Sequence, residues 1–219
     1  MSQVIKAIIF DVGGVLVRTE DSRPRRLLAA KLNLSINELY DLVFSTQTWD
    51  QAQRGKITNT AHWQEVGRQI GLTRPEEVKA FRADFFAGDR LDQKLLDFIL
   101  ELRTRYKVAI LSNAPGNLRN WIAREWEIPD DTFAAIVISG EEGVMKPHPQ
   151  IYRVVLRRLG VTPSEAIFVD DMARNVSAAA QMGIHAVHYV TRESAIAQIK
   201  ALLTKASSDA TPDLTIPLE

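Results

Sequence analysis

The stretch that decides the fold is VIKAIIFDVGG, residues 4–14. Its apolar part ends at Phe10, and the carboxylate of Asp11 and a turn with Gly13 and Gly14 follow at once. A continuous apolar run of this kind predicts a parallel strand that is covered on both faces. The sequence therefore places one acid at the carboxyl end of a buried strand, where open α/β sheets bind their ligands.

Four further apolar runs have the same character, and segments with helical periodicity separate them. The runs are KVAILS (107–112), AAIVIS (134–139), AIFVD (166–170) and HAVHYV (185–190). The helical segments are 92–106, 117–127, 149–160 and 173–183. This alternation predicts a doubly wound, Rossmann-like α/β fold with a parallel sheet of about five strands. We assign residues 1–16 and 91–204 to this core domain.

Residues 17–90 interrupt the alternation and contain no recognisable strand. Helices are predicted at 23–33, 35–46, 59–71 and 75–87, with Thr58 or Asn59 capping the third and Pro75 opening the fourth. This segment is predicted to be a helical cap inserted after the first strand. Residues 205–219 contain two prolines and no periodicity, so we expect a loosely ordered tail.

The composition excludes several classes of function. Lys and Arg total 27, as do Asp and Glu, so the basic surface of a nucleic-acid-binding protein is not expected. Cysteine is absent, which excludes disulfides and thiolate chemistry. No apolar run reaches the roughly 18 residues of a membrane span. These features favour a soluble cytoplasmic protein, monomeric or homodimeric, without a membrane or nucleic-acid partner.

Polar side chains follow the predicted strands at the edge where Asp11 lies. Carboxylates on short turns are suitable ligands for Mg²⁺. A lysine, a hydroxyl and free backbone N–H groups suit a phosphate dianion, and a carboxylate aimed at phosphorus can act as a nucleophile. The glycines after Asp11 allow close approach of the backbone to a ligand. The polar residues are Asp11, Ser112, Asn113, Lys146, Asp170 and Asp171.

Four ordered motifs give the chain a family resemblance. They are FDVGGVL (10–16), LSNAP (111–115), GVMKPHPQIY (143–152) and FVDDMARNV (168–176). Each motif alone is weak, but four in this order, each associated with a predicted strand, are specific. Over about residues 5–190 the sequence resembles the haloacid dehalogenase-like (HAD) hydrolase superfamily. Within it, the chain is most similar to helical-cap phosphatases that act on sugar phosphates.

The resemblance implies a role for each matching residue. It implies that Asp11 is the nucleophile, which forms an aspartyl-phosphate, and that Lys146 neutralises charge beside it. Ser112, Asn113, Gly14 and Lys146 would bind phosphate. Asp11, the carbonyl of Gly13 and Asp171 would bind Mg²⁺, supported by Asp170 and Asn175. The implied reaction is hydrolysis of a small phosphate ester.

Two positions depart from the family pattern. Most phosphatases of the superfamily carry a second Asp, the general acid/base, where this chain has Gly13. His148 replaces a frequent Asp and is expected to cap the helix opened by Pro149. Two alternatives therefore stay open: a metal-independent 2-haloacid dehalogenase, and a non-catalytic ligand-binding domain. Trp49, His62 and Trp63 are interpreted mainly as packing residues between cap helices.

Overall fold

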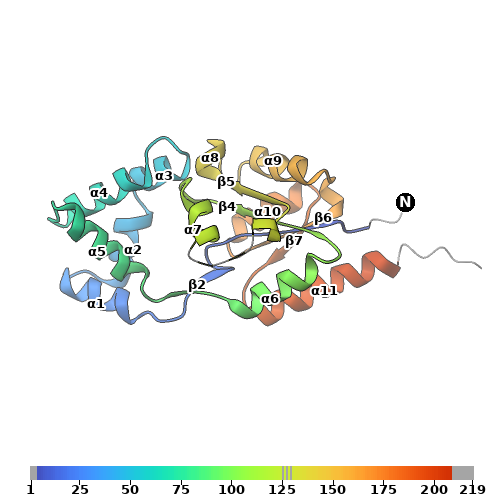
Figure 1. Cartoon of the computed structure of the whole chain (residues 1–219), viewed down its shortest axis with the longest axis horizontal. Helices are drawn as coiled ribbons and strands as arrows, with labels where there is room; N and C mark the ends of the chain where they lie inside the picture. The colour runs from blue at the N-terminus through green and yellow to red at the C-terminus, as the bar shows by residue number, and fades with distance from the viewer. Residues whose placement is uncertain (1–3, 125, 127, 129, 209–219) are drawn as a thin grey trace, which may run out of the picture.

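The computed structural model describes residues 4–124, 126, 128 and 130–208. These residues form a parallel sheet of five strands in the order β5-β4-β1-β6-β7 (Figure 1). In register, Ala7 of β1 lies between Lys107 of β4 and Ala166 of β6. The predicted fold class is confirmed. The strands are β1 Ala7–Phe10, β4 Lys107–Ser112, β5 Ala135–Ile138, β6 Ala166–Asp170 and β7 His185–His188.

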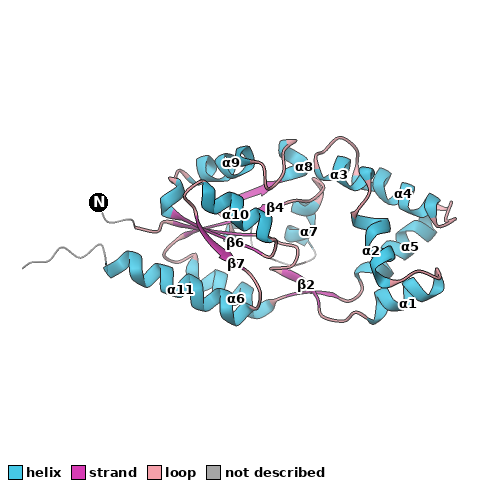
Figure 2. Cartoon of the chain, turned by 180° about the vertical axis from the view of Figure 1, so that it is seen from behind, coloured by secondary structure: helices cyan, strands magenta, loops and turns pink. Residues whose placement is uncertain are grey.

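Helices cover both faces of the sheet, as continuous apolar strands require (Figures 1 and 2). Ile8 and Phe10 of β1 pack with helices α6 and α11, whereas Ile9 packs with α9 and α10. Gly160 closes α9 in the left-handed conformation, as its position predicts. The core helices are α6 Gln93–Leu102, α7 Leu118–Arg124, α8 Ser139–Glu142, α9 Pro149–Leu159, α10 Ala173–Gln181 and α11 Arg192–Ser208; η1 Asp130–Thr132 and η2 Pro163–Glu165 are 3-10 turns.

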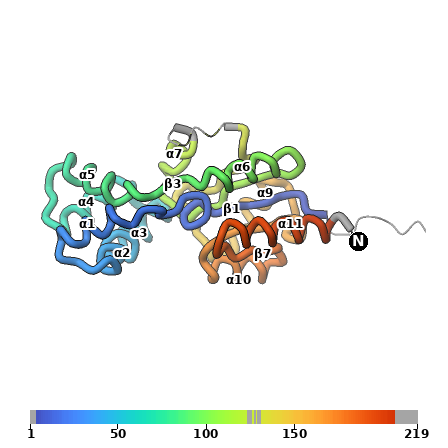
Figure 3. The backbone as a smooth tube through the Cα atoms, turned by 90° about the horizontal axis from the view of Figure 1, so that it is seen from below, coloured from blue at the N-terminus to red at the C-terminus, as the bar shows by residue number. Residues whose placement is uncertain are grey.

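The inserted helices gather at one end of the elongated molecule and have an apolar core of their own (Figure 3). Thr58 caps α4 and Pro75 opens α5, as predicted. Helix α3 was not predicted. The division of the chain at residues 17 and 90 stays a prediction. The insert helices are α1 Arg23–Lys31, α2 Ile36–Phe44, α3 Gln47–Gln53, α4 Asn59–Gln69 and α5 Pro75–Phe86.

The expectation that residues 17–90 lack strands is wrong. Strand β2, Val17–Thr19, pairs antiparallel with β3, Asp89–Leu91, where the chain leaves and re-enters the core. Buried Arg25 of α1 holds this ladder: its guanidinium donates to both carboxylate oxygens of Asp89 at 2.8 and 2.7 Å and to the carbonyl of Phe85 at 2.9 Å. The insert is therefore attached through a hydrogen-bonded ribbon.

The C-terminal boundary also differs from the expectation. Helix α11 continues to Ser208, so residues 205–208 are helical and do not belong to the expected tail; residues 209–219 lie outside the described residues. Among the described helices, none combines the length and apolar character needed to cross a membrane.

Candidate active site

The carboxyl ends of three adjacent strands bring the predicted residues together. Asp11 follows β1, the central strand, and its backbone N–H donates to the carbonyl of Val169 at 2.9 Å. Ser112 ends β4 and Asp170 ends β6 on either side. Because the strands are parallel, these side chains share one edge of the sheet.

Lys146 lies at the centre of the cluster and is completely buried. Its Nζ is 2.9 Å from Asp11 Oδ1 and 2.6 Å from Asp170 Oδ2, and it donates to the carbonyl of Leu111 at 2.9 Å. The ammonium thus has two hydrogen-bond acceptors and a second carboxylate in ion-pair contact, as a buried cation requires. The structure therefore places Lys146 between the two acids.

Burial raises the pKa values of Asp11 and Asp171. Desolvation raises the pKa of Asp11 to about 7, with Lys146 opposing the shift and Asp170 adding to it. Desolvation, followed by the charge of Asp170, also raises the pKa of Asp171. Carboxylates held in this way gain from a cation that neutralises them.

Asp171 meets the glycine turn after β1. One carboxylate oxygen each of Asp11, Asp170 and Asp171 lies within 4.8 Å of the others. Gly14 has φ +80°, and a Cβ at this position would be 2.2 Å from Asp171 Oδ2. A side chain at position 14 therefore has no room. A Cβ at Gly13, in contrast, would have nothing within 4 Å.

Asn113 forms two hydrogen bonds with the backbone of Lys146. Its Nδ2 donates to the carbonyl of Lys146 at 2.9 Å, and its Oδ1 accepts from the Lys146 N–H at 2.8 Å. The side chain of Asn113 is thus engaged by Lys146 and is not free to bind phosphate as the resemblance implied, and α7 begins only at Leu118. Ser112 is buried, and its hydroxyl has no hydrogen-bond partner among the described residues.

Asn175 holds Asp170. Its Nδ2 donates to both carboxylate oxygens of Asp170 at 3.0 and 3.2 Å, and its own carbonyl accepts from the Tyr152 hydroxyl at 2.9 Å. Tyr152 could not be identified from the sequence, because an apolar helix position gives no signal of a polar contact. His148 caps α9 by accepting from the Gln150 N–H, as predicted.

The insert reaches the core beside this cluster. Gln53 Nε2 of α3 donates to the carbonyl of Asn113 at 2.9 Å. Gly55, just past α3, lies so close to Gly140 that a Cβ would be 2.2 Å from the Gly140 carbonyl oxygen. Neither residue was identified from the sequence, because α3 itself was missed. The glycine after a short polar helix was the available signal.

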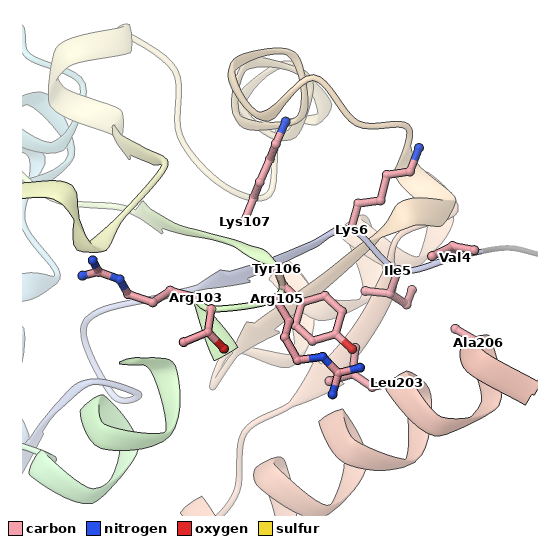
Figure 4. Close-up of a pocket in the computed structure, with 10 residues that line it drawn as sticks. Val4, Ile5, Lys6, Arg103, Arg105, Tyr106, Lys107, Leu203 and Ala206 are labelled. Carbon is pink, nitrogen blue, oxygen red and sulfur yellow. The ribbon is translucent and has the colours of Figure 1, made fainter. Parts of the chain in front are cut away.

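A separate hollow of about 630 Å³ lies at the opposite edge of the sheet, between the starts of β1 and β4 and helix α11 (Figure 4). Basic residues line it, but their charged ends diverge. Lys6 pairs with Glu165, and Arg103 pairs with Asp131. The hollow therefore lacks a set of converging groups that would hold an anion.

Known proteins of similar sequence include hydrolases and phosphatases. A family model for haloacid dehalogenase-like hydrolases matches residues 5–183. A sesquiterpene phosphatase of Aspergillus oryzae is 30% identical over 208 residues, which cover 93% of this chain and 99% of that protein. A D-ribitol-5-phosphate phosphatase of Bacteroides thetaiotaomicron is 30% identical over 188 residues, covering 82% and 89%.

Solved structures show the same fold. A HAD family enzyme of Bacteroides thetaiotaomicron, in complex with magnesium and inorganic phosphate, aligns with TM-score 0.69 and 23% identity over 84% of this chain and 93% of that one. An L-2-haloacid dehalogenase of Xanthobacter autotrophicus aligns with TM-score 0.60 and 20% identity, covering 98% and 92%. These findings confirm the predicted resemblance and the prediction of an enzyme: the chain belongs to the haloacid dehalogenase-like hydrolase family.

Proposed function

We propose that this protein is a Mg²⁺-dependent hydrolase of small, sugar-phosphate-like phosphomonoesters that works through an aspartyl-phosphate on Asp11. The observation that carries the proposal is the cluster around Asp11: its Oδ1 is 2.9 Å from the Lys146 ammonium, and one of its carboxylate oxygens lies within 4.8 Å of Asp170 and Asp171. Two relatives that are 30% identical are named as phosphatases, which supports phosphate esters as substrates.

The contacts of Asp11 leave one oxygen for chemistry. Oδ1 accepts from the Val12 N–H at 2.7 Å and lies against Lys146. Oδ2 has no such partner among the residues described, and we expect it to form the bond to phosphorus. Lys146 would stabilise the charge that develops on the phosphoryl oxygens. Ser112, which ends β4 beside Asp11, would bind the same oxygens. The backbone N–H of Gly14, its only donor, donates to the carbonyl of Val17 at 2.9 Å, so the predicted phosphate contact of Gly14 is not free to form in this conformation.

The donor set fits a small, hard cation. Carboxylate oxygens of Asp11 and Asp171, with the backbone carbonyl of Gly13, would hold Mg²⁺, which prefers oxygen ligands and keeps several waters. Asp170 is occupied by Lys146 and Asn175, so its role is to position the lysine. Bound Mg²⁺ supplies positive charge that polarises the phosphoryl group.

The substitution Gly14→Ala tests this metal site. The added Cβ would displace the Asp171 carboxylate, so we expect Mg²⁺ affinity to fall roughly 10- to 100-fold, as for other disturbed ligand shells. Titration of the thermal unfolding midpoint with Mg²⁺ measures this. Gly71→Ala is the matched control: its φ is +76°, but nothing lies within 4 Å of its added Cβ. Equal Mg²⁺ responses in the two variants contradict the assignment.

The reaction would proceed in two displacements. Asp11 attacks phosphorus, and the bond from phosphorus to the ester oxygen breaks, which gives the aspartyl-phosphate and an alkoxide that takes a proton. A water molecule then attacks the aspartyl-phosphate and releases inorganic phosphate and free Asp11. Because residue 13 is glycine, the proton for the leaving alcohol comes from water or from the inserted helices. This favours esters with good leaving groups.

Hydrolysis of a panel of sugar phosphates and an activated aryl phosphate, with Mg²⁺ and with EDTA, tests the proposal directly. Phosphate release that requires Mg²⁺ and returns when the chelator is titrated with metal is the expected result. A folded protein that releases no phosphate from any ester overturns it.

A metal-free assay with 2-chloro acids distinguishes the proposed phosphatase from the alternative, a 2-haloacid dehalogenase. The paired acids Asp170 and Asp171 count against that reaction, because a site for an organic anion gains nothing from them. Chloride release without metal is therefore expected to be at background.

A further inference from the structure

Arg82 lies where the insert meets the core. It projects from α5, and its guanidinium carbon is 5.7 Å from the ring centroid of Trp63 in α4 and 5.8 Å from that of Trp121 in α7. One of the two indole rings that flank Arg82 thus belongs to the insert, and the other belongs to the core. Trp121 is 39% exposed, so solvent reaches this place.

Arg82 also lacks a counter-ion. Within residues 4–124, 126, 128 and 130–208, no carboxylate pairs with its guanidinium and no hydrogen bond is made by it. Each of the other half-buried or buried arginines among the described residues pairs with a carboxylate; these are Arg18, Arg25, Arg54, Arg103 and Arg192. Burial lowers the pKa of Arg82 from its ordinary value. A partly desolvated guanidinium with five donors and no acceptor is unfavourable unless an anion arrives from outside.

A second unpartnered group lies beside it. His62 is fully buried, its Nδ1 is 2.9 Å from Thr48 Oγ1, and its Nε2 has no hydrogen-bond partner among the described atoms. Burial, and then the nearby positive charge of Arg82, lower the pKa of His62 to about 4. The imidazole is therefore neutral at pH 7. When Thr48 donates to Nδ1, Nε2 carries a proton that it can donate.

Arg82 and His62 lie on the part of the insert that faces the active-site turn of the core. Trp121 belongs to α7, the helix that follows the turn of Ser112 and Asn113, and Figures 1 and 2 both place α7 next to the inserted helices. Gln53 of the insert contacts the carbonyl of Asn113 in that same turn. A leaving group that extends from a phosphate at this turn toward the insert would run toward Arg82.

We propose that Arg82 binds a second anionic group on the leaving group of the substrate, a carboxylate or another phosphoryl group. The substrate class is then a phosphorylated acid or a bisphosphate. This inference rests on the proposed phosphatase function. Arg82 forms bidentate contacts with either anion, and the flanking indoles hold the guanidinium plane in place.

Matched pairs of esters test the inference. The pairs are glycerol 3-phosphate with 3-phosphoglycerate, glucose 6-phosphate with 6-phosphogluconate, and fructose 6-phosphate with fructose 1,6-bisphosphate. The first two pairs add a carboxylate at different distances, and the third adds a phosphoryl group. For at least one pair, wild-type protein should have a KM roughly 10- to 100-fold lower for the more anionic member, the effect of a charged hydrogen bond.

Substitutions assign the effect to Arg82. Arg82→Gln should remove the preference for the more anionic ester by raising KM for that ester alone. Arg82→Lys should keep part of this preference. Lys79→Gln removes an exposed cation from the same helix and should keep the whole preference. Equal KM values within every pair overturn the inference. An Arg82→Gln variant that raises KM equally for both members of a pair also overturns it, because Arg82 would then only hold the insert against the core. Turnover of the less anionic members reports separately on the phosphatase function.

Discussion

Asp11→Asn is expected to reduce phosphate release by on the order of 10⁴-fold or more, the scale seen when a covalent nucleophile is removed. An amide oxygen is a poor nucleophile and cannot form the aspartyl-phosphate. The loss should fall on kcat with every ester, because it removes the chemical step and leaves the leaving-group contacts intact. Single-turnover phosphate release measures it.

The same substitution should leave the metal-free fold intact. Burial disfavours the charged form of Asp11, and asparagine has nearly the same shape without the charge. Lys146 keeps Asp170 and the Leu111 carbonyl as partners. We therefore expect an unfolding midpoint in EDTA at least equal to that of wild type. Asp97→Asn, on an exposed position of α6, is the control for a generic Asp substitution. A folded Asp11→Asn protein with a tenth of the wild-type rate contradicts the nucleophile assignment.

The fold was predictable where local pattern and tertiary environment agree. Strands 107–112 and 166–170 were predicted with the bounds that the structure shows, because a strand covered on both faces is apolar at every position. Helix α3 reads QTWDQAQ and offers little apolar periodicity. Strands β2 and β3 are short and partly polar. They pair with each other across about 70 residues, and the Arg25–Asp89 contact that supports them spans 64 residues, so local pattern does not reveal them.

The cluster at the sheet edge was predictable because topology alone brings strand ends together. Asp11, Lys146 and Asp170 are in contact there. The supporting contacts were not predictable: Asn113 and Lys146 are 33 residues apart, and their double hydrogen bond depends on how one loop lies over another. Motif spacing specifies which side chains reach the edge, whereas loop packing decides what each one contacts.

Gly13→Asp is expected to raise the rate of hydrolysis of alkyl phosphates by roughly 10²-fold, the lower end of the range for general acid catalysis. The structure has room for the change. Gly13 is exposed, it is not among the glycines with positive φ, and a Cβ there meets nothing within 4 Å. Its backbone carbonyl, the proposed metal ligand, is retained. The new carboxyl group would stand two residues from Asp11, where it can protonate the leaving oxygen.

The ratio of alkyl to aryl ester rates decides whether a proton donor has been added. An aryl leaving group departs as a stable anion and needs little protonation, so its rate should change far less than that of an alkyl ester. Gly13→Asn is the matched control, because it has the size of aspartate without a transferable proton, and it should leave the ratio at the wild-type value. An equal gain in both variants, or an equal gain on both esters, means that position 13 acts through packing. A selective gain means that glycine at this position restricts the wild-type protein to esters whose leaving group needs no acid.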